Sequence, residues 1–159
     1  MTTTYSTPSA QFPAFPSVRL QVPDTWEPLT VEETILAVGA PTGPGEFKPN
    51  VCVTARRKPG SVSLDDVAAG TAEKLSQADG FAEIGRENRT VLGVPGFRIE
   101  GSFEMAGVGG VFQAVHLAVI EHPTVTDIVE VVASSSAEQA RTLVPVLRGI
   151  LDSAELLDT

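Results

Sequence analysis

The chain has 159 residues, of which 42% are hydrophobic and 19% charged, and its 11 Lys and Arg against 20 Asp and Glu give a net charge of −9. A chain of this length folds as one ordinary domain whose core needs neither disulfides nor a structural metal. The acidic balance argues against nucleic acid as a partner, because phosphate binding needs clustered Lys and Arg. No apolar run approaches the roughly 18 residues of a membrane-spanning helix, so we expect a soluble chain without membrane insertion.

Cysteine usage and the first residues bear on the cell compartment. Cys52 is the single cysteine, which excludes an internal disulfide and a cysteine-rich zinc site. Residues 1–17 are rich in Thr, Ser and Pro, carry no Lys or Arg, and lack the apolar run of a signal peptide. We expect them to form an extended or disordered tail, with Phe12 and Phe15 as its large apolar groups. These features favour a cytoplasmic location.

The folded part is predicted to begin near Val18 with three strands. Apolar and polar side chains alternate over Val18–Val22, the pattern of a half-buried strand, and a second apolar strand is expected over Thr34–Ala40. Four Pro or Gly breakers in Pro41–Gly45 fix a loop before a third strand, which runs from roughly Asn50 to Arg57.

A helix follows over Ser63–Ala78. Ser63 is placed to cap it, and Asp66 lies in the first turn, where a carboxylate suits the positive end of the helix dipole. Apolar residues recur at helical spacing, and Asp79-Gly80 closes the element. One face of this helix is expected to pack on a sheet.

Period-two patterning then returns and predicts further strands in hairpin order. Gly107–Gly110 is interpreted as a hairpin turn rather than a phosphate loop, because it joins two strands and lacks the full glycine pattern. Val111–Ile120 is apolar on both faces, which indicates a central strand covered on both sides. The strands are expected at 82–91, 97–104, 111–120 and 127–133.

The chain closes with a second helix, which Ser134–Ser136 open and which extends to about Leu151. Strands in hairpin runs with few crossovers predict an α+β domain, built on a mainly antiparallel sheet with two main helices packed on it. We expect residues 18–156 to form this single domain.

Few residues of the sequence are candidates for a catalytic or metal-binding role. Cys52 lies in an apolar strand with no basic neighbour in sequence and is interpreted as a buried structural thiol. His116 lies in the most apolar strand and is interpreted as a core histidine, whereas His122 at a strand end is expected to be solvated. Ser134–Ser136 are explained by helix capping. No catalytic, cofactor-binding or metal-binding residue is therefore predicted, and no cofactor.

Four residues are candidates for binding a partner protein. Trp26 and Phe47 are aromatic groups beside turns or basic residues, and Arg56 and Arg57 belong to the single basic run of an acidic chain. The simpler interpretation is that Trp26 fills the apolar face of the sheet and that the basic run is a solvated strand end.

Several short sequence segments resemble those of a known family. Leu20–Trp26, Phe47–Val53 and the helix from Gln139 to Leu151 are similar to the LpqN/LpqT-like proteins of mycobacteria and related actinobacteria, over about Val18 to Leu156. The resemblance implies a Mog1/PsbP-like fold with a central antiparallel sheet, and it brings no catalytic residues. Known members are mostly envelope lipoproteins, whereas this chain shows no lipoprotein signal or its cysteine. The Ala and Val content and the low ratio of Lys to Arg fit a high-GC actinobacterial source.

Three hypotheses for the function stay open. The leading one is a non-enzymatic protein-binding or adaptor domain, because no polar motif converges. The alternative is a small-molecule-binding or hydrolytic site in a cleft between sheet and helix, using His116 with Glu100 or Glu130. A homodimer through an exposed sheet edge, or through Phe12 and Phe15, is the third.

Overall fold

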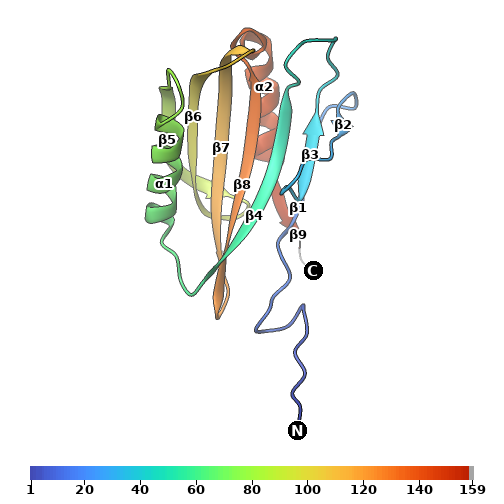
Figure 1. The fold of residues 1–159 in the computed structure, drawn as a ribbon, viewed down its shortest axis with the longest axis vertical. Helices are drawn as coiled ribbons and strands as arrows, with labels where there is room; N and C mark the ends of the chain where they lie inside the picture. Colours follow the sequence, from blue (N-terminus) through green and yellow to red (C-terminus); the bar gives the residue numbers. More distant parts are fainter. Residues whose placement is uncertain (158–159) are drawn as a thin grey trace.

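A seven-stranded antiparallel sheet dominates the computed structural model, which describes residues 1–157 (Figure 1). Its strands lie in the order β2-β3-β4-β8-β7-β6-β5. Their bounds are Glu27–Pro28 (β2), Leu36–Gly39 (β3), Asn50–Pro59 (β4), Ala82–Val91 (β5), Val94–Met105 (β6), Gly109–Glu121 (β7) and Val125–Ser136 (β8). Every neighbouring pair is antiparallel, which confirms the predicted α+β class.

Tight hairpins connect β5, β6, β7 and β8, which are neighbours in the sheet. Gly107 and Gly109 have φ values of +81° and +91° in the β6–β7 turn, a region of backbone space that favours glycine. The interpretation of Gly107–Gly110 as a hairpin turn is therefore confirmed. β7 lies between β8 and β6, and its residues 114–118 are buried, so the predicted central strand is also confirmed.

The two helices begin where the sequence signals them. The Oγ of Ser63 accepts from the backbone N–H of Asp66 at the start of α1, Leu64–Ser76. Ser136 and Gln139 form a reciprocal capping box at the start of α2, Ala137–Ser153, with both hydrogen bonds at about 3 Å. No helix within residues 1–157 has the length and apolar character needed to cross a membrane.

The helices cover opposite faces of the sheet. On one face, Val67 and Ala72 of α1 pack with Ile99 and Leu117, and on the other face Leu147 of α2 packs into a larger apolar cluster. Full burial of one such aliphatic side chain contributes about 1.5–3 kcal/mol. The helix α1 packs mainly on β6 and β7, so its side of β8 and β4 lies without a helix above it (Figure 1).

The first predicted strand is wrong in its extent. Only Ser17–Arg19 (β1) is a strand, and it pairs with Glu155–Leu157 (β9) in a separate two-stranded sheet. The alternation arises because Val18, Leu20 and Val22 pack against the apolar cluster under α2. Period-two patterning reports which side chains are half-buried and does not identify a strand's partner.

Residues 1–16 contain neither a helix nor a strand. Contacts with the sheet nevertheless begin before Val18. The Phe15 ring lies over the Arg57 guanidinium at 4.2 Å, and the Oγ1 of Thr124 donates to the carbonyl of Gln11 at 3.4 Å. Residues 11–15 are thus held against the end of the sheet that carries the β7–β8 hairpin.

Candidate functional site

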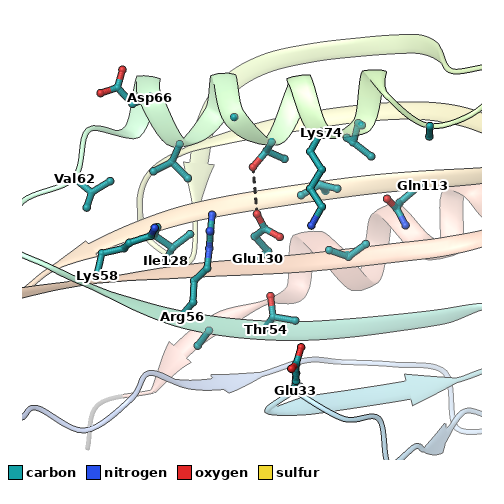
Figure 2. A pocket seen from close by; sticks show the side chains of 18 of the residues that line it. Glu33, Thr54, Arg56, Lys58, Val62, Asp66, Lys74, Gln113, Ile128 and Glu130 are labelled. Atoms are coloured by element: carbon teal, nitrogen blue, oxygen red, sulfur yellow. Dashed lines mark hydrogen bonds between the residues drawn. The ribbon is translucent and has the colours of Figure 1, made fainter.

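The incomplete cover by α1 leaves a groove between this helix and the exposed half of the sheet, which we call the α1 groove (Figure 2). Its volume is about 1260 Å³. Side chains of α1 form one wall and side chains of β4 the other. The residues from these elements and from the intervening strands are Asp66, Val67, Gly70, Thr71, Lys74 and Leu75 of α1, Thr54, Ala55, Arg56 and Lys58 of β4, Phe103 of β6, Gln113 and Val115 of β7, and Ile128, Glu130 and Val132 of β8.

The alternation of side chains along a strand decides which residues of β4 and β8 face the α1 groove. Thr54, Arg56 and Lys58 alternate along β4 and face the helix, while Ile128 and Val132 supply apolar floor from β8. The groove therefore combines an apolar floor with polar and cationic walls.

Glu130 is the acidic group of the groove floor. Its Oε1 accepts a hydrogen bond from the Thr71 hydroxyl of α1 at 3.2 Å, which links the α1 wall to the floor (Figure 2). Glu130 lies directly opposite Thr54 in the β4–β8 register. Figure 2 shows Arg56 reaching into the groove from β4 and Lys74 reaching in from α1.

The residues named for a hydrolytic site are not brought together. Glu130 lines the α1 groove, whereas His116 and Glu100 lie on the other face of the sheet, beside α2. The β7–β8 register pairs His116 with Val131, the neighbour of Glu130 whose side chain packs in the cluster under α2. The sheet itself thus separates the two halves of the hypothetical site.

Glu100 is the centre of a buried charge network on the α2 side. It is 1% exposed, and its carboxylate accepts from Arg148 Nε at 3.0 Å and Nη2 at 2.6 Å, with Arg98 Nη1 at 3.1 Å. Burial alone would raise the pKa of Glu100, but the two guanidinium groups hold it below its usual value. The carboxylate is ionised and its oxygens are occupied, so it anchors α2 to β6 and is not free as an acid or base.

His116 is a core residue, as the sequence predicts. It is 3% exposed, and burial, reinforced by the charge of Arg89, lowers its pKa to about 4. An imidazole with that pKa is neutral at physiological pH. Nothing of His116 faces the α1 groove.

Asp127 organises a second ion cluster, at the sheet end where the tail docks. It is fully buried and accepts from Arg57 Nε at 2.7 Å and Nη2 at 2.9 Å, and its Oδ2 lies 2.9 Å from His122 Nε2. Burial opposes ionisation of Asp127, yet these partners lower its pKa. The expectation that His122 is solvated is wrong, because its side chain is only 22% exposed and contacts this carboxylate.

The four predicted partner-binding residues lie in different places. Trp26 is half-buried against the apolar cluster under α2, and Phe47 lines a smaller hollow of about 630 Å³ at the start of α2. Arg57 is held by Asp127 and Phe15, whereas Arg56 faces the α1 groove. Their role in binding a partner stays a prediction, and they do not form one continuous surface.

Sequence reasoning missed the α1 wall of the groove. In the sequence, Gly70, Thr71 and Lys74 fall inside the helix predicted over Ser63–Ala78, where a glycine is unfavourable by about 1 kcal/mol relative to alanine. That unexplained glycine was the available signal. Small side chains at this position leave the groove open.

The described part of the chain gives little support for a nucleophilic thiol or a metal site. Burial raises the pKa of the Cys52 thiol, which disfavours the nucleophilic thiolate. No group of three or more His, Cys, Asp or Glu side chains within residues 1–157 is arranged to hold a metal ion.

The fold is similar to several solved structures. LpqN of Mycobacterium tuberculosis, described as involved in cell envelope biogenesis, superposes with a TM-score of 0.76 at 19% identity, over 90% of this chain and 84% of that one. The cyanobacterial PsbP protein of Synechocystis sp. PCC 6803 gives a TM-score of 0.59 at 13% identity, over 99% of both chains. The protein of unknown function PA94 from Pseudomonas aeruginosa gives 0.55 at 15% identity, over 82% of this chain and 91% of that one. These likenesses confirm the Mog1/PsbP-like fold.

A search of curated protein sequences finds no match. A family model described as "Probable lipoprotein LpqN" matches residues 4–157. This description contradicts the predicted cytoplasmic location and points to the cell envelope. The prediction was wrong because it took the location from what residues 1–17 lack, and the composition of a tail does not locate the folded domain. The match extends over nearly all of the 159 residues, and the chain belongs to the LpqN family of probable lipoproteins.

Proposed function

We propose that this chain is a non-enzymatic protein-binding domain of the cell envelope, which takes a segment of its partner into the α1 groove. The observation that carries the proposal is the groove itself, with an apolar floor, polar walls and about 1260 Å³ of space. The involvement of M. tuberculosis LpqN in cell envelope biogenesis supports the cellular setting.

The size of the groove favours a chain segment over a small molecule. Pockets for small ligands enclose about 300–1,000 Å³ and bury most of the ligand. The α1 groove exceeds that range and runs between a helix and the uncovered strands β4 and β8. A strand or helix of a partner laid beside α1 would bury apolar surface on both sides, which is how amphipathic segments dock.

A small ligand is the second candidate, because a cleft between helix and sheet is also a common place for one. Hydrolysis is not favoured. The charged groups that could act as acid and base either lie on the other face, as His116 and Glu100 do, or already accept a hydrogen bond, as Glu130 does.

Two helix glycines offer a matched pair of variants. Gly70 lines the α1 groove and Gly149 lies in α2. Among the described residues, a Cβ at either position meets no heavy atom within 4 Å apart from its own helix backbone and chain neighbours. Gly70→Trp places an indole at the groove, while Gly149→Trp places the same group on the other helix. Both replace a mid-helix glycine, so their effects on helix propensity are alike.

The test is native mass spectrometry of the protein isolated gently from the envelope fraction of its source organism. We expect a stoichiometric protein adduct on the unsubstituted chain and on Gly149→Trp, and its loss from Gly70→Trp. A small adduct mass with the same dependence would favour the second candidate. An adduct that survives Gly70→Trp would show that the partner binds elsewhere.

A further inference from the structure

We infer that the segment accepted by the α1 groove is acidic as well as apolar, an inference that rests on the proposed function. Three cations, Arg56, Lys58 and Lys74, line the groove from both walls. Within residues 1–157, none of the three has a carboxylate within 4.0 Å.

The other cations of the chain are mostly neutralised by their own neighbours. Of the 11 Lys and Arg, six form ion pairs with an Asp or Glu within residues 1–157, and all six lie outside the groove. They are Arg19, Arg57, Arg86, Arg89, Arg98 and Arg148. A chain with nearly twice as many acids as bases thus leaves the cations of one groove without carboxylate partners.

Three carboxylates also line the groove, equal in number to its cations, but none of them lies within 4.0 Å of a groove cation. Figure 2 shows Asp66 pointing outward at one end of α1 and Glu33 lying beyond β4, at the margins of the groove. Glu130 is the acidic side chain of the floor, and Thr71 donates to it. Two of the cations, Arg56 and Lys74, reach in over this floor from opposite walls.

This arrangement defines the chemistry of the occupant. Apolar side chains of the segment would lie on Ile128 and Val132, and carboxylates on its flanks would meet Arg56 on one side and Lys74 on the other. Ion pairs formed inside such a groove are screened less by salt than pairs on an open surface. The partner segment is therefore one in which apolar residues alternate with Asp or Glu.

The net charge of −9 makes the test stringent. The overall field of the protein repels acidic peptides, so their binding requires local contacts with cations that have no carboxylate partner. A random peptide library displayed on phage and selected on the full-length protein is an unbiased probe. The recovered peptides are then synthesised, and their Kd is measured by fluorescence anisotropy at low and high salt.

Charge variants identify the cations responsible. Arg56→Gln/Lys74→Gln removes one cation from each wall. Arg141→Gln removes one from the exposed surface of α2, where Arg141 has no carboxylate of residues 1–157 within 4.0 Å. We expect net-negative, partly apolar peptides whose Kd rises at least tenfold in the double variant and is unchanged in Arg141→Gln. Their binding should also weaken as salt increases.

The two proposals fail in different ways. Neutral or basic peptides that Gly70→Trp displaces, but that bind the charge variant normally, would overturn the acidic occupant and leave the groove as a binding site. Peptides that bind equally well to Gly70→Trp, or a selection that recovers no peptide dependent on the groove, would overturn both.

Discussion

Replacing His116 by Gln should remove much of the protein's sensitivity to mild acid. Burial, with the charges of Arg89 and Arg98 against those of Asp152 and Glu100, leaves the folded-state pKa at about 4 against an ordinary value of 6.5. The folded imidazole therefore stays neutral over a range in which the unfolded chain takes up a proton. The stability from this group is present above about pH 6.5 and is lost as pH falls toward 4.

The size of the effect follows from the two pKa values. Between pH 7 and pH 5, preferential protonation of the unfolded chain should lower the free energy of unfolding of the unsubstituted protein by about 2 kcal/mol. The buried carboxylates of Glu100 and Asp127 have lowered pKa values in the folded protein. They therefore reduce the free energy of unfolding only at lower pH, where the same carboxyls protonate in the unfolded chain. They are also present in both proteins.

The assay is urea unfolding at pH 7, 6 and 5, followed by the fluorescence of Trp26, which is the single tryptophan and is half-buried. We expect the free energy of unfolding to fall as pH is lowered in the unsubstituted protein. In His116→Gln it should fall by about 2 kcal/mol less, at similar m-values. Equal losses in the two proteins would refute the reasoning. Such a result would mean that His116 titrates normally in the folded state.

Three further predictions concern stability and the tail. Leu147→Ala, at a fully buried position of α2, should lower the free energy of unfolding by about 2–5 kcal/mol in urea titrations, whereas Ile84→Ala on exposed β5 should change it by less than about 0.5 kcal/mol. Glu100→Gln should cost about 2 kcal/mol in the same assay, because two guanidinium groups lose their charged partner, and an unchanged midpoint would contradict the network. Phe15→Ala should speed proteolysis within residues 11–15 without changing global stability, since it removes the contact with Arg57; equal cleavage rates would argue against docking.

The features that could be predicted from sequence are those fixed by short-range chemistry. The caps Ser63 and Ser136 and the hairpin at Gly107–Gly110 depend on residues within a few positions of one another, and the structure has each where expected. The central position of β7 was also predictable, because burial on both faces removes polar residues from a strand.

The α1 groove could not be predicted, because it depends on where α1 lies across the sheet. Nothing in the helix pattern says that it covers β6 and β7 and leaves β4 and β8 open. The pairing of Arg57 with Asp127 joins residues 70 positions apart, and the separation of His116 from Glu130 depends on strand register. Register is set by the folded sheet and is not visible in one strand's sequence.

The most direct test of the account is amide hydrogen exchange of the protein with and without the partner recovered from the envelope fraction. Binding in the α1 groove should slow exchange in α1, residues 64–76, and in the neighbouring parts of β4, while α2 and β5 keep their rates. Slower exchange confined to α2 or to β5, with α1 unchanged, would contradict the assignment of the α1 groove as the binding site.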